Sequence, residues 1–426
     1  MEAIVTAAGT GRARRWATSR KSCFWGPARL GAAAALLLGS AAAGAGQCYV
    51  NHAAGGANDG SSWANAYTDL QSALQSGSPA PACTEIWVAQ GVYKPAAAGS
   101  PDVAFSIRPG QQVYGGFAGT ETQRGQADPA AHRTVLSGDI DGDDTGKNAD
   151  GVVLDANSIA GSNSSHVVLM DGTTGTGPIG NDTVLDGLAI TGGVGRQVPY
   201  YGDLHAGGLY CNGRGSGSAC SPVLSRLWFS GNRAEWGGAM FVDGGTDGGS
   251  NGGSASPVIT RSLFSGNRAT HGGGAIYLQG SGAMLAQLTL QGNTASWSSA
   301  VQFQNSSGAT LRQSTISGNT ATDASVKSAV LFSSASSSTL DQVILWGNDG
   351  RNLYIYSGTP TVANSIVQGG CAAPFTCTNV SQADPQLGPL QDNGGATMSM
   401  LPAAGSPAID FAGNTGSCGD AASHTG

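Results

Sequence analysis

The chain contains 426 residues, of which 68 are glycine, about twice the usual proportion. Charged residues make up 11% and hydrophobic residues 40% of the sequence, so the chain is too apolar to be disordered. Its glycines also lack the three-residue period of collagen. Because glycine costs about 1 kcal/mol at each position inside a helix, this composition disfavours a helical bundle and favours many short strands joined by tight turns.

Residues 1–46 have the pattern of an export signal. A basic segment precedes an apolar stretch over residues 30–43, and small residues follow at a position that suits a signal peptidase. The apolar stretch is shorter than the ~18 residues of a membrane-spanning helix, and an uncleaved anchor is the alternative. We therefore expect an exported chain, secreted or associated with the outer membrane or cell surface, with no integral membrane span after processing.

The charge of the remaining chain restricts its partners. Removing residues 1–46 takes away six basic residues and one acidic residue, which changes the net charge from −7 to −12. Such an acidic chain is unsuited to nucleic acid. Cations, glycans or other proteins are the expected partners of an acidic exported protein.

Seven cysteines follow residue 46, and none belongs to a CxxC pair. A zinc ribbon or thioredoxin-like site is therefore not expected. An oxidising compartment would favour disulfides instead, although sequence alone cannot determine their connectivity. The spacings suggest three pairs and leave Cys418 over: Cys48 with Cys83, Cys211 with Cys220, and Cys371 with Cys377.

A repeat organises the centre of the chain. Five Gly-Asn pairs recur at spacings of 35, 26, 26 and 29 residues, and a large apolar residue lies three positions before each asparagine. A unit of about 26 residues with two or three short strands and no helix suits one coil of a parallel β-helix, in which successive coils pair at about 4.8 Å. The repeated asparagines would then stack into a ladder: Asn232, Asn267, Asn293, Asn319 and Asn348.

A polar column lies six positions before these asparagines, starting with Arg226 and Arg261. The strand that follows has period-two alternation, with Leu227 and Phe229 on one face and Trp228 on the other. We expect the column and Trp228 to face outward, where arginine and an exposed aromatic could bind a sugar chain. A solvated sheet face without a ligand is the alternative.

Two repeat motifs resemble a known family. Residues 229–232 and 264–267, both Phe-Ser-Gly-Asn, resemble the FxxN motif of polymorphic outer-membrane protein repeats, and residues 273–276 match their GGAI motif. The resemblance implies an all-β, single-stranded right-handed parallel β-helix similar to the pectate-lyase fold. This fold serves enzymes, adhesins and inert scaffolds alike, so the resemblance does not itself define an activity.

The flanking segments extend the resemblance to exported bacterial β-helix proteins. Residues 59–71 resemble their N-terminal segment, and residues 390–395 and 405–410 resemble the tail of the choice-of-anchor Q group, in which a β-helix precedes a surface-attachment module. The expected organisation has four parts: a signal peptide (1–46), an N-terminal cap with the first coils (47–135), β-helix repeats (136–379) and an anchor-type tail (380–426).

The N-terminal cap should contain a short helix. Trp63, Tyr67, Leu70 and Leu74 have helical spacing, which predicts an apolar helix face that covers the first coil. Residues 85–93 then have the pattern of the first strand.

The densest acidic segment predicts a calcium site. Hard cations need several oxygen ligands, and alternate aspartates in a turn supply them. The spacing resembles a calcium loop, but the turn glycine falls one place early and the flanks are not helical, so we expect a loop site and not an EF-hand. A solvated acidic turn is the alternative. The candidate ligands are Asp139, Asp141, Asp143, Asp144 and Asp150.

Some of these carboxylates could also act in catalysis. Polysaccharide lyases of this fold pair calcium with a basic residue, and glycoside hydrolysis needs two carboxyl groups. Asp139 and Asp141 with Arg133 or Lys147 form the candidate catalytic set. Because no convergent set is evident, we predict a monomeric protein that binds an extracellular glycan or a host or cell-surface protein without catalysis. The alternatives are a calcium-assisted polysaccharide lyase or glycoside hydrolase, and a passive surface or matrix protein.

Overall fold

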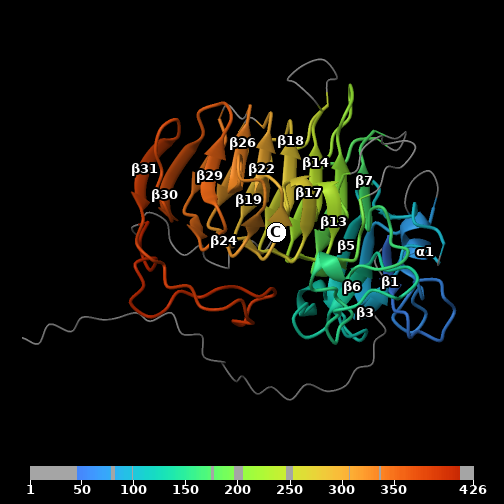
Figure 1. Cartoon of the computed structure of the whole chain (residues 1–426). Coiled ribbons are helices and arrows are strands. Elements are labelled where there is room, and N and C mark those ends of the chain that lie inside the picture. Colours follow the sequence, from blue (N-terminus) through green and yellow to red (C-terminus); the bar gives the residue numbers. More distant parts are fainter. Residues whose placement is uncertain are drawn as a thin grey trace, which may run out of the picture. The chain divides into compact units, whose positions relative to one another are not determined.

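Each sequence repeat forms one coil of a stack of parallel strands (Figure 1). The computed structural model describes residues 46–412, apart from 78–81, 98, 174–176, 196–204, 246–252, 307 and 335–336. The described residues belong to one compact unit, residues 42–426. Nearly all of the expected signal segment, as well as Cys418, lies outside the described residues. Within the described part of the chain, no helix is long and apolar enough to cross a membrane.

Two series of strands form the largest sheet, in which every pairing is parallel. The first series contains β1 (Gln47–Val50), β2 (Glu85–Ala89), β5 (Gln112–Phe117), β8 (Val184–Asp186), β11 (Val223–Ser225), β15 (Val258–Thr260), β19 (Met284–Ala286), β23 (Thr310–Arg312), β27 (Thr339–Asp341), β30 (Thr361–Val367) and β31 (Thr376–Ser381). The second contains β3 (Gly91–Tyr93), β6 (Thr134–Ser137), β9 (Leu188–Thr191), β12 (Trp228–Ser230), β16 (Leu263–Ser265), β20 (Thr289–Gln291), β24 (Thr315–Ser317) and β28 (Ile344–Trp346).

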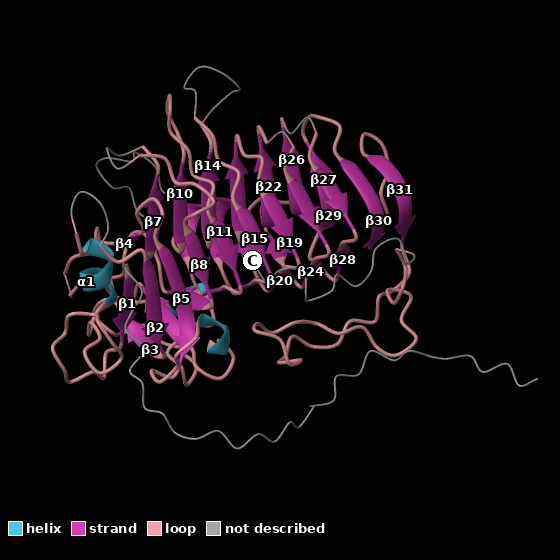
Figure 2. Ribbon diagram, turned by 180° about the vertical axis from the view of Figure 1, so that it is seen from behind, coloured by secondary structure: helices cyan, strands magenta, loops and turns pink. Residues whose placement is uncertain are grey.

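Two smaller parallel sheets complete the coils. The eight-stranded sheet contains β4 (Phe105–Ser106), β7 (Val168–Asp171), β10 (Leu209–Asn212), β14 (Met240–Asp243), β18 (Ile276–Gln279), β22 (Ser298–Gln304), β26 (Ser328–Ser333) and β29 (Arg351–Ile355). The four-stranded sheet contains β13 (Arg233–Trp236), β17 (Arg268–Gly272), β21 (Thr294–Ala295) and β25 (Thr320–Ala321). A central coil therefore has four short strands, for example β15 to β18, and not the expected two or three. Figure 2 shows the same stack from behind.

The extra strand arises at a corner that the sequence pattern did not reveal. The predicted polar column lies between the first and second strand of each coil, where its residues have left-handed backbone geometry, with φ of 51° at Arg226 and 49° at Arg261. Gln287, Gln313 and Gln342 occupy the same corner with φ between 49° and 57°. The column therefore marks a bend in the chain between two strands.

The asparagine column forms a continuous hydrogen-bonded ladder inside the stack. The Nδ2 atom of Asn232 donates to Oδ1 of Asn267 at 3.0 Å, and the same bond joins each later pair at 2.9 Å. Each ladder asparagine also donates to a backbone carbonyl of the preceding coil. These bonds satisfy amides that the coil buries, and they hold the corners of successive coils in register.

Apolar side chains fill the interior of the coils. The rings of Phe229 and Phe264 stack with centroids 4.8 Å apart, and those of Phe303 and Phe332 stack at 4.9 Å. All four rings are fully buried. Parallel strands in register bring equivalent side chains of adjacent coils together, so a repeated phenylalanine stacks on itself.

A short helix, α1 (Leu70–Gln75), follows the first strand and buries Leu70, Ala73 and Leu74. Asp69 caps its N-terminus by accepting a hydrogen bond from the Ser72 amide at 2.8 Å. Because this cap starts the helix at Leu70, the helix is shorter than predicted. Trp63 and Tyr67, which were expected on its apolar face, precede it in the chain. Two single-turn 3-10 helices lie at Arg124–Gln126 and Ala156–Ser158.

The segment expected to be the first strand is instead two strands, β2 and β3, and β1 precedes both. Only Gln90 separates the two strands, and Gly91, the first residue of β3, has a φ of 138°, which glycine adopts without steric cost.

Three disulfides join the expected cysteine pairs. Cys48 is bonded to Cys83, Cys211 to Cys220 and Cys371 to Cys377, with Cα–Cα distances of 5.5, 5.7 and 6.0 Å. The first joins β1 to the segment before β2, and the third joins Cys377 of β31 to the loop before it. These bonds stabilise local loops near both ends of the described stack and at its centre.

The chain after β31 folds back on the outside of the coils as a hairpin over residues 387–402, here called the C-terminal hairpin. Antiparallel bridges join Leu387 to Pro402 and Gln391 to Ser399. Its Leu390 and Met398 pack against a buried cluster that contains Trp228 and Leu263. The hairpin thus covers the outward side chains of β12 and β16.

Candidate functional site

The groove predicted around Arg226, Arg261 and Trp228 is not open. Arg226 forms a bidentate ion pair with Asp186, with N–O distances of 2.7 and 2.8 Å, and this hydrogen-bonded partner raises the pKa of Arg226 above its usual value. Arg261 donates to Ser225 Oγ at 3.1 Å. Trp228 is only 5% exposed, and its indole donates to Ser265 Oγ. The expected exposed aromatic is therefore covered.

The structure brings three of the five predicted acidic ligands together. Oxygen atoms of Asp139, Asp143 and Asp144 lie within 4.8 Å of one another. The side chain of Asp141 lies beside Asp143, and its Oδ2 also accepts from the Ser162 amide at 2.8 Å. Asp150 lines a separate cavity and accepts from Asn148. The linear spacing of a calcium loop is therefore not reproduced in space.

The acidic cluster contains a cation from the chain itself. Lys147 Nζ lies 2.8 Å from Asp139 Oδ2 and also donates to the Gly142 carbonyl. Burial alone would raise the pKa of Asp139, but the hydrogen bond and charge of Lys147 outweigh it and lower the pKa below 3.8. Burial raises the pKa of Asp144, and weak burial together with the charge of Asp141 raises that of Asp143. Lys147 therefore neutralises one of the three close carboxylates, Asp139.

Replacing Lys147 with methionine should destabilise this loop. The carboxylate of Asp139 is 3% exposed, so removal of its cation leaves a buried unpaired charge. We expect a loss of about 2–3 kcal/mol, below the ~3–5 kcal/mol of fully buried pairs, because Lys147 is itself 30% exposed. Because Lys147 lowers the pKa of Asp139, its stabilisation should be complete at neutral pH. It should be lost as the pH falls through the folded-state pKa, below 3.8.

Urea unfolding of the wild type and the variant between pH 2 and 7 measures this difference. Lys327→Met is the matched control, since Lys327 contacts an Asp349 carboxylate that is 54% exposed, and exposed pairs contribute at most ~1 kcal/mol. An equal loss in both variants, or a difference that persists at pH 2, would contradict the account.

An open groove lies over the four-stranded sheet, beside the segment that links the acidic loop to β7. Its volume is about 360 Å³, which falls within the range of small-molecule sites. Arg233 of β13 and Arg268 of β17 are cross-strand neighbours and line the groove with Glu235 and Thr270. Arg268 Nη1 donates to Asn157 Oδ1 at 2.7 Å. Polar groups of two coils thus face one space.

Aromatic side chains lie next to these polar groups. The ring of His271 stacks on Trp236, with centroids 4.8 Å apart and planes at 13°, and meets the edge of Trp297 at 5.5 Å. His271 Nδ1 lies 3.1 Å from Glu235 Oε1, a contact that fixes the orientation of the imidazole. The three rings are half-buried and present a fixed surface to solvent. Together with the residues that line the groove, they are here called the basic–aromatic groove.

This arrangement offers the chemical groups that bind a sugar. A sugar ring has an apolar C–H face that packs on an aromatic ring and hydroxyl edges that bond to charged and amide groups. The basic–aromatic groove contains both kinds of group. Arg268, Glu235 and Asn157 line the cavity, and the aromatic cluster adjoins it through the contact between His271 and Glu235. Two of the clustered carboxylates, Asp139 and Asp144, are buried instead, which suits a cation better than a polymer.

The sequence pattern did not predict this aromatic cluster. A signal was present, because Trp236, His271 and Trp297 each lie four positions after a ladder asparagine. Strand alternation would place this position inside the coil with the alanine two positions earlier. A register shift between Ala234 and Trp236 interrupts the alternation and brings the position to the surface.

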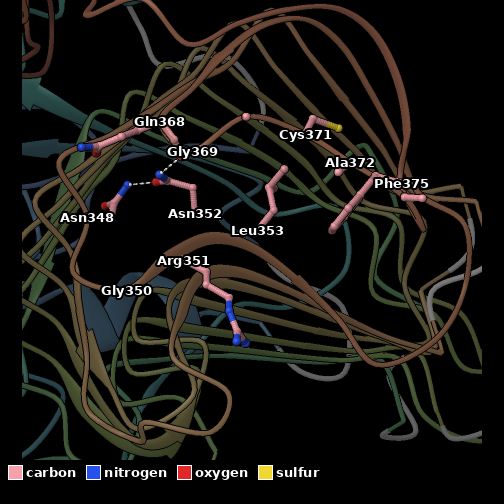
Figure 3. Close-up of a pocket in the computed structure, with 12 residues that line it drawn as sticks. Asn348, Gly350, Arg351, Asn352, Leu353, Gln368, Gly369, Cys371, Ala372 and Phe375 are labelled. Atoms are coloured by element: carbon pink, nitrogen blue, oxygen red, sulfur yellow. Dashed lines mark hydrogen bonds between the residues drawn. The ribbon is translucent and has the colours of Figure 1, made fainter.

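A larger cavity of about 650 Å³ lies where the ladder ends (Figure 3). Asn348, Asn352 and Gln368 form its polar side, and Leu353 and Phe375 lie opposite. Asn348 donates to Asn352 Oδ1 at 2.8 Å, and Asn352 donates to the Gln368 carbonyl at 2.7 Å. These amides satisfy one another, so we assign the cavity to the end of the coil and not to a ligand.

Comparison with known proteins supports the architecture. The family model for a right-handed beta helix region matches residues 211–382. No curated protein and no solved structure matches the chain significantly. The matched region contains the five-asparagine ladder and the strands of the repeated coils. This match and the parallel strand ladders together identify the chain as a right-handed parallel β-helix protein.

Proposed function

We propose that this protein is an exported, surface-exposed β-helix that binds an extracellular glycan in the basic–aromatic groove. The observation that carries the proposal is the half-buried tryptophan pair, Trp236 and Trp297, whose centroids lie 5.1 Å apart beside groove-lining charged groups. Tryptophan contributes large contact areas and dominates many binding surfaces. Trp236 ends β13, and Trp297 lies in the two-residue turn between β21 and β22. The coils therefore hold both rings in place, which limits the entropy lost on binding.

Three features support an extracellular role for the chain. Three disulfides suit an oxidising compartment. The N-terminal sequence has the pattern of an export signal. The terminal motifs resemble those of exported choice-of-anchor Q proteins, a group in which the β-helix is held at a surface. A cell-surface protein that carries such a glycan is the natural partner of a monomeric chain of this kind.

A glycan array followed by calorimetry tests the function. Wild-type protein should bind at least one class of oligosaccharide, and Trp236→Ala and Trp297→Ala should each weaken that binding by at least about tenfold, equivalent to 1.4 kcal/mol. The loss follows from removal of an aromatic face that packs on the sugar ring.

Trp346→Ala is the matched control, because Trp346 is also half-buried but lies at the end of β28, outside the groove. Its binding should equal that of the wild type. An array without any bound glycan, or equal losses in all three variants, would reject the proposed function and favour a passive surface or matrix protein.

A calcium ion in the acidic cluster is a second part of the proposal. The donors fit a hard cation, since Asp139, Asp143 and Asp144 supply close carboxylate oxygens, but Lys147 already neutralises one of them. Calcium should therefore raise the melting temperature of Lys147→Met more than that of the wild type. Unchanged melting temperatures of both proteins in excess calcium would remove the site.

The second candidate function is that of a carbohydrate-active enzyme. The close carboxylates of the acidic loop favour it. Sugar-release assays with and without calcium distinguish it from a binder. Product formation by the wild type that is lost in Asp143→Asn would favour the lyase or hydrolase, since Asp143 is the exposed member of the cluster.

A further inference from the structure

The guanidinium group of Arg133 faces a cavity and has no hydrogen-bond or ion-pair partner among the described residues. Its guanidinium carbon lies 5.4 Å from the ring centroid of Trp228, and its Nε atom is buried and unpaired. Within the described part of the chain, the guanidinium makes neither a hydrogen bond nor an ion pair. The Nε atom is out of reach of solvent, but the two Nη groups remain able to donate to a molecule in the cavity.

The cavity beside Arg133 lies between the coils and the C-terminal hairpin. Its volume is about 370 Å³, near the lower limit of small-molecule sites. Leu154, Trp228 and Leu263 form an apolar wall on the side of the coils, and Met398 of the hairpin closes the opposite side. A ligand of this cavity must therefore be small and must have an apolar face.

The charges around the cavity limit the ligand further. Burial lowers the pKa of Arg133, and the nearby carboxylates of Asp150, Asp128 and Asp392 oppose that shift, so the arginine stays cationic. Asp150 and Asp392 both line the cavity. Several carboxylates surround one cation, which disfavours an anionic ligand and provides acceptors for hydroxyl groups.

We propose that this cavity binds a single uncharged sugar ring of hexose size. The planar guanidinium offers parallel N–H donors that fit two neighbouring hydroxyl oxygens. Asp150 and Asp392 accept hydrogen bonds from the hydroxyl groups, and Leu154 and Met398 contact the C–H face of the ring. A hexose is the ligand whose one apolar face and ring of hydroxyls match these walls.

The site is separate from the basic–aromatic groove. Residues 154–157 lie between them, since Leu154 lines the cavity whereas Asn157 lines the groove. This segment is fixed to the coils by the Ala156 amide, which donates to the Gly266 carbonyl at 2.9 Å. Binding in the cavity therefore does not depend on the function proposed for the groove.

Ligand-detected NMR and calorimetry with monosaccharides test the inference. The probes are glucose, galactose and mannose, with glucuronate and glucosamine as rings of similar size that carry opposite charges. We expect saturable binding of at least one neutral hexose and weaker binding of glucuronate. Arg133→Gln should weaken hexose binding at least about tenfold, because hydrogen bonds to charged groups contribute strongly.

Two further variants test whether the hexose binds in this cavity, and a control variant tests whether the loss of an arginine alone affects binding. Ala396→Phe, at the tip of the C-terminal hairpin, fills the cavity without removing the guanidinium and should abolish binding, whereas Trp236→Ala should leave it unchanged. Arg124→Gln is the matched control, since Arg124 lies 4.9 Å over Tyr114 outside the cavity. Absence of hexose binding, tighter binding of glucuronate, or binding that survives Ala396→Phe would each overturn the proposal.

Discussion

Replacement of Asn293 by alanine is expected to lower the free energy of unfolding by about 3–5 kcal/mol. The side chain is fully buried. It donates to Asn319 Oδ1 and to the Phe264 carbonyl, and it accepts from the amide and side chain of Asn267. Alanine removes these four hydrogen bonds, each of which contributes about 0.5–1.5 kcal/mol. The buried amide of Asn267 is then left without an acceptor, whereas Asn319 Oδ1 and Asn267 Nδ2 each keep one other partner.

Urea unfolding measures this loss, and Gln291→Ala is the control. Gln291 lies two positions earlier in the same turn and is half-buried, so its truncation should change stability by less than about 0.5 kcal/mol. Equal effects of the two substitutions would contradict the ladder as a source of stability and would assign the asparagines to turn geometry alone.

Gly266→Ala is expected to cost about 3 kcal/mol and to displace the segment after the acidic loop. Gly266 has a φ of 61°, and this left-handed geometry alone costs about 1–2 kcal/mol for a residue with a Cβ atom. The new Cβ would also collide with the Leu154 carbonyl, and overpacking of this kind adds about 1–3 kcal/mol.

Gly292→Ala separates the two contributions. Gly292 occupies the same corner one coil later with a φ of 67°, but the nearest atom to its Cβ would be 3.9 Å away. Only the backbone contribution of about 1–2 kcal/mol should remain. If thermal or urea unfolding gave equal losses for the two variants, residues 153–157 would not be docked on these corners.

Contacts between equivalent residues of successive repeats could be predicted from the sequence. The coils stack in register, so residues at the same position of two neighbouring repeats lie next to each other. The position of Asn232 in its repeat matches that of Asn267, and strand register alone brings the two amides together. The disulfides follow from short separations, such as the nine residues between Cys211 and Cys220. The architecture therefore depends on repetition, which a single sequence displays.

The site could not be predicted in the same way, because it depends on exceptions to the repeat. Trp228 has the alternation of an outward residue, but the C-terminal hairpin, more than 150 residues later in the chain, covers it. Trp236 reaches the surface through a register shift that no residue type marks. Asp150 belongs to the acidic segment but lies near Arg133 instead of the acidic cluster. Irregular loops, and not the coils, determine these positions.

Amide hydrogen exchange with and without the glycan selected on the array tests the central claim most directly. The account predicts slower exchange in β13, β17 and the segment from β21 to Trp297, which form the basic–aromatic groove. Exchange in β28, on a different face of the coils, should not change. Protection confined to other strands, or no protection at a saturating glycan concentration, would contradict the assignment of the groove as the binding site.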